Sequence, residues 1–368
     1  MKNLINTLIL AVFAGLFTIN VSAQQLEVVG AIMPPQPDMS GIAVTNDGRV
    51  FLGFPRHAEN HHGCALAELK DGVLIPFPNK EMTYPSDRPC SEWLVSPHGM
   101  TTDSAGNIWL IDDGKRAGIE GIPDGAAKVV GFQPDGHIIA SIPIQSHVLR
   151  QDMHLNDLRI DLKHGKKGMA YITNSSFGTT PSLVIVDIAT GHAREVLAGH
   201  YSTAMQEGYI AFLEGEVRAY NKNHVILPSG GANGIALIGN RLYWTPITGR
   251  GFYSISTDSL SDFRLSETEL ERIVRYDGDR PACDGLAEDC EGNIYFSAYE
   301  QMALVKRDTN GVFHTLVQSP LLGWPDGMFV TSDGWLYVTL GQWNRLPGFN
   351  EGKDLRKPPY NVVRLKVK

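Results

Sequence analysis

After residue 23 the sequence contains no long apolar run, and this absence argues against a membrane-spanning helix in the rest of the chain. Basic residues are not in excess: the formal net charge of −8 argues against nucleic acid, whose phosphates require a basic face. There is no phosphate-binding loop, no dinucleotide-binding motif and no local signature of Ser-His-Asp or Cys-His-Asp catalysis. The partner expected for such an acidic chain is a neutral or cationic small molecule, or a divalent cation.

The N-terminal segment has the pattern of a cleavable signal peptide. Lys2 precedes a mostly apolar run, and Val21-Ser22-Ala23 supplies the small residues that a signal peptidase needs. No cysteine follows Ala23, so a lipoprotein anchor is not expected. The sequence therefore predicts a signal peptide over residues 1–23, a single domain over residues 24–368, and a secreted or periplasmic protein.

Cysteine is scarce, with four residues in the chain. An oxidising compartment permits disulfides. An extended segment between Cys283 and Cys290 would place them about 20 Å apart, whereas a bridge needs Cα atoms within about 7 Å. We therefore expect Cys64 to pair with Cys90, and four free thiols are the alternative.

The chain does contain an internal repeat. Each copy has a polar residue, a glycine or aspartate, an apolar stretch, a turn and an apolar-aromatic strand. The six copies span residues 40–52, 98–110, 156–172, 233–244, 284–296 and 326–338.

Each copy consists of two alternating β-runs joined by a turn such as Asn46-Asp47-Gly48, which is typical of a hairpin. The spacing between copies fits four-stranded blades with variable loops, and no helical pattern of comparable strength occurs. The sequence therefore predicts an all-β fold, a six-bladed β-propeller. Its strand-like ends, residues 26–29 and 362–367, are expected to pair within one blade and so to protect its edge.

The repeat also predicts where function resides. The innermost strand of each propeller blade lines the channel, so the residues that open these strands should form one ring. The predicted ring is Ser40, His98, Asn156, Asn233, Asp284 and Asp326. Loops that return to the same rim should surround it, and they begin near Asp112, Asn174, Pro246, Tyr299 and Trp343.

Four ring residues offer oxygen ligands for a cation, namely Asn156, Asn233, Asp284 and Asp326. Calcium takes six to eight oxygens and often mixes carboxylate, amide and water. The alternative is that Asn and Asp before glycine only shape the strand entry through local hydrogen bonds. We predict calcium as the cofactor and Ser40, Asp112, Asn174, Tyr299 and Trp343 as ligand-binding residues.

His98 is the one imidazole in the predicted ring, and its near-neutral pKa suits a general base acting on water or on a substrate proton. The alternative is a hydrogen-bonded structural histidine. Three further histidines, His57, His61 and His62, could bind a transition metal, but we expect them in an exposed polar loop. Trp324, Trp343 and Tyr299 could stack on an aromatic or amine ligand, although packing is the usual role of such residues.

Several segments resemble the yellow/major royal jelly protein family, in order along nearly the whole mature chain. They are residues 107–114 (NIWLIDDG), 154–161 (HLNDLRID), 170–174 (AYITN), 233–237 (NGIAL), 242–246 (LYWTP) and 252–260 (FYSISTDSL). The resemblance implies a secreted six-bladed propeller. Members differ in role, since some bind biogenic amines, some act on dopachrome and others are nutritional or structural, so fold follows from membership better than reaction does.

The ring is also similar to that of calcium-dependent lactonase propellers of the gluconolactonase, regucalcin and paraoxonase type. That resemblance implies a catalytic role for His98 and calcium ligands at Asn156, Asn233 and Asp284. The glutamate ligand of those proteins would fall at Ser40, which has no carboxylate, so Asp38 or Asp326 must compensate or the site is metal-free.

Two classes of function remain open at this point. One is a calcium-dependent lactone or ester hydrolase that uses His98 as its base. The other is a non-catalytic protein that binds an amine or aromatic ligand, with a dopachrome-type tautomerase as a weaker enzymatic alternative.

Overall fold

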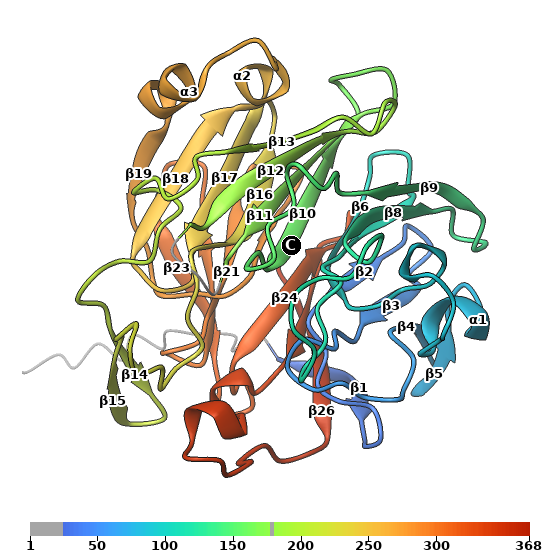
Figure 1. The fold of residues 1–368 in the computed structure, drawn as a ribbon. Coiled ribbons are helices and arrows are strands. Elements are labelled where there is room, and N and C mark those ends of the chain that lie inside the picture. Colours follow the sequence, from blue (N-terminus) through green and yellow to red (C-terminus); the bar gives the residue numbers. More distant parts are fainter. Residues whose placement is uncertain (1–24, 177–179) are drawn as a thin grey trace, which may run out of the picture.

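The computed structural model describes residues 25–176 and 180–368, which form six four-stranded antiparallel sheets around a central axis (Figure 1). The predicted six-bladed β-propeller is confirmed. The predicted signal peptide, residues 1–23, lies outside the described residues. Within the described residues, none of the helices combines the length and apolar character that a membrane crossing requires.

Each of the first five blades uses four strands that follow one another along the chain, the innermost first. Blade 1 contains β2 (Ile42–Val44), β3 (Val50–Gly53), β4 (Leu66–Lys70) and β5 (Val73–Pro76). Blade 2 contains β6 (Pro97–Thr102), β7 (Ile108–Asp112), β8 (Lys128–Phe132) and β9 (Ile138–Pro143). Blade 3 contains β10 (Leu155–Asp161), β11 (Met169–Asn174), β12 (Ser182–Asp187) and β13 (Ala193–Val196).

The second half of the circle repeats this order. Blade 4 contains β16 (Ala232–Ile238), β17 (Arg241–Pro246), β18 (Gly251–Ser256) and β19 (Arg275–Asp279). Blade 5 contains β20 (Leu286–Glu288), β21 (Ile294–Ala298), β22 (Ala303–Arg307) and β23 (Phe313–Gln318). Blade 6 contains β24 (Pro325–Val330), β25 (Trp335–Leu340), β26 (Tyr360–Lys366) and, outermost, β1 (Glu27–Ile32).

Blade 6 closes the circle with strands from both ends of the chain. Glu27 of β1 lies opposite Arg364 of β26, and the guanidinium Nε of Arg364 donates to Glu27 Oε2 at 2.8 Å. The predicted pairing of the two chain ends is therefore confirmed, and β26 is paired on both sides.

Aspartates stabilise the hairpin turns between the first two strands of blades 2 and 5. In blade 2, Asp103 Oδ1 accepts hydrogen bonds from the backbone N–H groups of Ala105 and Asn107, both at 2.9 Å. In blade 5, Asp289 makes the same pair of bonds to residues 291 and 293. The side chain thus satisfies the turn's backbone donors, as short Asp-containing turns require.

The hydrophobic core lies between the blades. Inner strands such as β7 and β11 are buried on both faces, so each interface is a sandwich of apolar side chains from two neighbouring sheets. Between blades 2 and 3, for example, Trp109 and Ile111 pack with Ile160 and Ile172. Equivalent clusters occur at the other five junctions, including the one between blades 6 and 1.

Short elements decorate the propeller. They are the helices α1 (Lys80–Thr83), α2 (Thr257–Ser261) and α3 (Glu267–Ile273), and the 3₁₀ turns η1 (Cys90–Glu92), η2 (Trp343–Arg345) and η3 (Pro347–Phe349). A separate hairpin, β14 (Ile210–Leu213) with β15 (Glu216–Ala219), belongs to none of the blades (Figure 1).

The predicted disulfide is wrong in this structure. All four cysteines are free. Cys64 packs in the core shared by blades 1 and 6, whereas Cys90 packs against the core between blades 2 and 3. The two thiols therefore lie in different packing layers of the circle.

Candidate functional site

The predicted ring converges on one space. Five of its six members line a cavity of about 730 Å³: His98, Asn156, Asn233, Asp284 and Asp326. The sixth, Ser40, lies beside them, where its Oγ is 3.3 Å from Nδ1 of His98. All six side chains are buried. The ring thus forms the floor of the cavity.

Irregular strand pairing turns the ring side chains inward. The register of the inner strand shifts between Pro97 and Met100 in blade 2, and between Pro325 and Met328 in blade 6. Blades 3 and 4 have the same irregularity around Asn156 and Asn233. A bulge of this kind re-aims a side chain, so the polar residue faces the axis and not a neighbouring sheet.

A glycine follows every ring residue except Asn156, which precedes Asp157, and its presence has a steric cause. A Cβ on Gly285 would lie 2.2 Å from the backbone oxygen of Asp326, and one on Gly327 would lie 2.0 Å from that of Ser40. Both distances are far below van der Waals contact, so only glycine lets adjacent inner strands approach so closely. The same contact with the next ring residue's oxygen occurs at Gly41, Gly99 and Gly234.

Two ring carboxylates are held by tryptophan indoles. Trp324 Nε1 donates to Oδ2 of Asp284, and Trp343 Nε1 donates to Oδ2 of Asp326, both at 2.7 Å. Burial, together with the nearby charge of Asp326, raises the pKa of Asp284 well above its usual value. Burial raises the pKa of Asp326 to about 6 against the bonds from Trp343 and Ser40. Neither carboxylate is ion-paired with a cation among the described residues.

The backbone around these tryptophans is strained. Trp324 has a φ of 62°, and Gln342, which precedes Trp343, has a φ of 46°. Bulky residues rarely adopt positive φ. Such strain persists only where surrounding structure enforces it, and it is frequent at functional sites. Here it accompanies the two indoles that fix the carboxylates.

Three imidazoles form one wall of the cavity. His57, His98 and His154 lie with their ring centroids 4.6 to 5.1 Å apart. One ring nitrogen from each falls within 4.8 Å of the other two. Burial lowers the pKa of His154 to about 3 and those of His57 and His98 well below the usual value. All three are therefore neutral near pH 7 and can accept a proton or bind a metal.

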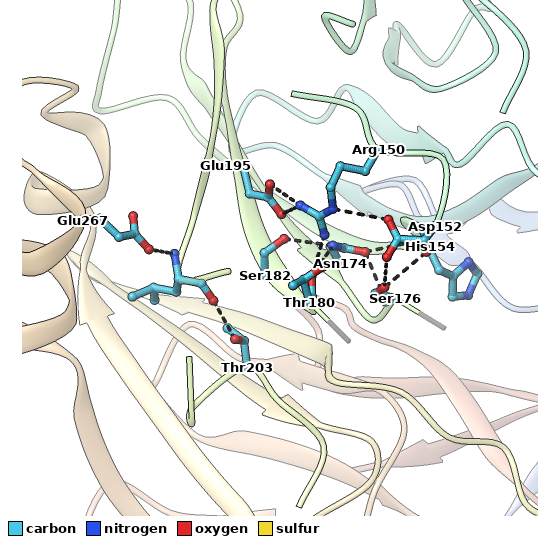
Figure 2. A network of polar contacts seen from close by, with 11 residues as sticks. Arg150, Asp152, His154, Asn174, Ser176, Thr180, Ser182, Glu195, Thr203 and Glu267 are labelled. Carbon is cyan, nitrogen blue, oxygen red and sulfur yellow. Dashed lines mark hydrogen bonds and ion pairs between the residues drawn. The ribbon is translucent and has the colours of Figure 1, made fainter. Parts of the chain in front are cut away.

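A buried carboxylate orients His154. Its Nδ1 lies 2.8 Å from Oδ2 of Asp113, whose other oxygen accepts the backbone N–H of Lys115 at 2.9 Å. The backbone N–H of His154 donates to Oδ1 of Asn174 at 3.0 Å. Figure 2 shows Asn174 inside this polar network while the imidazole of His154 points away from it.

A buried arginine shapes the segment that carries His57. The guanidinium of Arg56 donates to five backbone carbonyls, those of His61, Gly63, Thr83, Leu94 and Val95. His57 faces the cavity and His61 is buried, so the expectation of an exposed histidine loop is wrong for both. His62 is exposed, as expected.

Two long loops cover the cavity. Met205 and Val225 of one loop, and Leu346 and Phe349 of the other, contribute apolar lining. The guanidinium of Arg218 joins the loops, since it donates to the backbone oxygen of Phe349 at 3.2 Å and to Asn350 Oδ1 at 3.1 Å. The cavity thus combines a polar floor with a largely apolar roof.

The structure places three predicted ligand-binding residues elsewhere. Asp112 pairs with Lys128 and caps the backbone N–H groups of residues 95 and 96. Asn174 supports His154, and Tyr299 stacks on Trp324 and bonds to Tyr209. None of the three lines the cavity, whereas Trp343 does.

Sequence reasoning missed His154 and Asp113, and it named His57 as a possible transition-metal ligand only within a loop expected to be exposed. His154 and Asp113 stand within segments that carry the family resemblance, two residues before a ring asparagine and at the end of a strand. Their position beside the ring was the available signal. His57 offered no such signal, because its loop lies outside the repeat.

Comparison with known proteins agrees with this architecture. A family model described as major royal jelly protein matches residues 95–338. No curated protein sequence matches the chain.

Solved structures with this fold include several enzymes. A calcium-binding protein, regucalcin, from Agrobacterium tumefaciens is 14% identical, with a TM-score of 0.54 over 94% of this chain and 96% of that one. A gluconolactonase from Xanthomonas campestris is 12% identical, with a TM-score of 0.53 over 93% and 89%. Virginiamycin B lyase from Staphylococcus aureus is 13% identical, with a TM-score of 0.51 over 94% and 99%. At these identities the likeness concerns the fold alone.

Proposed function

The chain belongs to the major royal jelly protein family, and from the chemistry of its cavity we propose that it binds a small amphipathic molecule and hydrolyses a lactone or ester bond in it with calcium. The observation that carries this proposal is the pair Asp284 and Asp326. Two buried carboxylates face one cavity and form no ion pair with a cationic side chain among the described residues, although Lys222 also lines that cavity. Buried charge of this kind is stable only when paired or when it binds a cation.

The floor supplies suitable ligands for calcium. Asp284, Asp326, Asn156 and Asn233 offer carboxylate and amide oxygens on one cavity surface, which is the donor set that calcium prefers. Asp326 supplies the second carboxylate in place of Ser40. Asp38 does not, because it hydrogen-bonds Arg356 at 2.9 Å and does not line the cavity. Bound calcium would polarise the substrate carbonyl.

His98 is the proposed general base. Its neutral imidazole lines the same cavity as the four oxygen ligands. In the proposed reaction His98 accepts a proton from water while the water oxygen attacks the acyl carbon. The acyl carbon–oxygen bond then breaks, and the proton passes to the departing alkoxide. The apolar roof holds the body of the substrate.

Export is part of the proposal. The signal-peptide pattern of residues 1–23 directs the chain out of the cytoplasm, to the periplasm or the medium. Cell fractionation with an antibody against the propeller tests this, and a cytoplasmic full-length chain would refute it.

The experiment that tests the function uses calcium titration and a panel of lactones and aryl esters. Wild-type protein should show a calcium-dependent rise in melting temperature and calcium-dependent turnover. Asp284→Asn should lose both, whereas His98→Gln should lose turnover but keep calcium binding. Calcium binding without turnover of any panel member would refute the hydrolase.

A second candidate rests on the same carboxylates. A cationic amine would neutralise them as a metal does, and Trp343 beside Asp326 offers an aromatic face to such a group. In that case the protein binds an amine without turnover. Amine binding that calcium does not displace, and that Asp326→Asn abolishes, would favour this candidate.

A further inference from the structure

We propose that His57, His98 and His154 form a binding site for one zinc-type transition-metal ion, distinct in ligand chemistry from the carboxylate floor. Imidazole nitrogens suit zinc, copper, nickel and iron, whereas carboxylate and amide oxygens suit calcium and magnesium. The cavity would thus bind a zinc-type metal at its histidines and calcium at its carboxylates and amides. This site goes beyond the hydrolase proposed above and does not depend on it.

The geometry is close to that of a three-histidine site. One nitrogen from each ring lies within 4.8 Å of the others. Zinc holds imidazole nitrogens at about 2.0–2.1 Å, so binding requires the rings to close in further. His57 can supply that movement, because its buried Nδ1 has no hydrogen-bond partner among the described residues. A buried polar atom without a partner is costly, and a metal would satisfy it.

The groups that hold His154 in place also match those around a metal-bound histidine. Metal-bound histidines usually donate their other ring N–H to a carboxylate, which fixes the tautomer. His154 has this arrangement, with Nδ1 at 2.8 Å from Asp113 Oδ2, so its Nε2 carries the lone pair. Asp113 is itself fully buried and held by the backbone of Lys115. The ammonium of Lys115, which faces His57 and His154, turns to the carbonyl of Gln151 at 2.8 Å.

A fourth ligand position faces the cavity. All three imidazoles line it, so water or a substrate oxygen can complete the coordination. Three protein ligands with one open position is the arrangement of catalytic zinc sites. The sharing of His98 has a consequence: a zinc-bound His98 cannot act as a base. Zinc should therefore inhibit hydrolysis that depends on His98.

The experiment titrates metal-free full-length protein with Zn²⁺ in the presence of saturating calcium. Wild-type protein should bind one equivalent. His57→Ala and His154→Ala should weaken zinc binding at least 100-fold, and Asp113→Asn should weaken it about 10- to 100-fold. His137→Ala, which removes an exposed histidine, is the matched control and should change nothing.

Two further readouts keep the inference separate from the hydrolase. Asp284→Asn should lose calcium and keep zinc, whereas His57→Ala should lose zinc and keep calcium. Circular dichroism of each variant checks folding, and His154→Gln replaces His154→Ala if the latter unfolds. Zinc binding that is absent, or unchanged in both His57 and His154 variants, overturns the inference, whatever the calcium result. Loss of calcium response with zinc binding intact refutes only the proposed function.

Discussion

Two sets of buried carboxylates in this propeller differ in how completely their charge and lone pairs are satisfied. Asp112 is saturated: Lys128 Nζ lies 2.9 Å from its Oδ2, and the backbone N–H groups of Val95 and Ser96 each donate to it at 2.7 Å. Lys128 in turn donates to three backbone carbonyls. Asp284 and Asp326 accept hydrogen bonds from indoles but are not ion-paired with a cation in the described part of the chain.

The difference separates structure from function. A buried carboxylate with every lone pair satisfied holds backbone segments together and has nothing left to offer a ligand. A carboxylate whose charge stays unneutralised, and whose pKa is raised in consequence, stores an unfavourable energy that a bound cation would release. Whether a buried carboxylate is structural or available to a ligand therefore depends on its hydrogen-bond and ion-pair partners. Its distance from the rim of the channel does not decide this.

The largest expected effect is on the saturated pair. Lys128→Met leaves the Asp112 charge buried without its cation, so the free energy of unfolding should fall by about 3–5 kcal/mol. Urea unfolding measures this. The double variant Asp112→Asn with Lys128→Met should recover part of the loss, since no charge then remains buried. A single variant as stable as the wild type would break the contrast.

Asp38 is an intermediate case and predicts a pH effect. Burial raises its pKa from 3.8 to about 7, although Arg356 opposes the shift, because that guanidinium is shared with Glu59 and Asp354. The folded state thus retains a proton that the unfolded state has lost. Stability should fall as pH rises from about 4 to 7, by at most about 1.4 kcal/mol per pH unit.

The check is urea unfolding between pH 5 and 8 for wild type and Asp38→Asn. The free energy of unfolding of the variant should depend less on pH below pH 7. Above pH 7 the two proteins should have the same slope. Asp354→Asn is the matched control, since that carboxylate bonds the same arginine but is half exposed and its pKa is lowered. An unchanged slope in Asp38→Asn would contradict the prediction.

Asp284→Asn should test the unsaturated pair directly. Because the variant removes a repelled charge and keeps an acceptor for Trp324, stability without calcium should be unchanged or higher at pH 8. The calcium-induced stabilisation, about 2.7 kcal/mol at one hundred times the Kd, should vanish. Calorimetry with and without calcium measures both.

Asp289→Asn, in the same blade, is the opposite control. Burial alone would raise the pKa of Asp289, but bonds from Asn293 and Tyr295 outweigh it and the pKa is lowered. That variant should lose about 1–2 kcal/mol of stability and keep the calcium response. If both variants changed stability and calcium response in the same way, Asp284 and Asp289 would not differ in role.

The smallest effect on stability is expected at His164, which forms ion pairs with two carboxylates near the surface. Its two ring nitrogens each lie 2.8 Å from a carboxylate, Asp161 and Asp258. Burial opposes protonation, but the two carboxylates outweigh it and raise the pKa of His164. Its contribution is complete below pH 6.5 and is lost as pH rises through the raised pKa. His164→Gln should remove less than about 1 kcal/mol at pH 6 and less still at pH 9.

The sequence predicted the fold because period-two hydrophobic alternation and turn residues recur in every blade. It predicted the ring because a polar residue, in five blades followed by glycine, recurs at the start of each inner strand. The glycine recurs because a Cβ there would clash with the backbone oxygen of the next ring residue. It could not predict the role of Asp112, because proximity to the rim does not reveal whether a side chain turns to the axis or to neighbouring backbone. The sequence named His57 as a possible metal ligand but could not place it in the cavity, since buried Arg56 determines its loop through contacts distant in sequence.

Blade 6 has a consequence for biosynthesis. Its outermost strand, residues 27–32, is made among the first and its partner, residues 360–366, among the last. During translation the early strand therefore keeps an unpaired edge until residues 360–366 have left the ribosome. An unpaired edge is open to pairing with other chains, so blade 6 is complete, and the edge protected, only after residues 360–366 join the sheet.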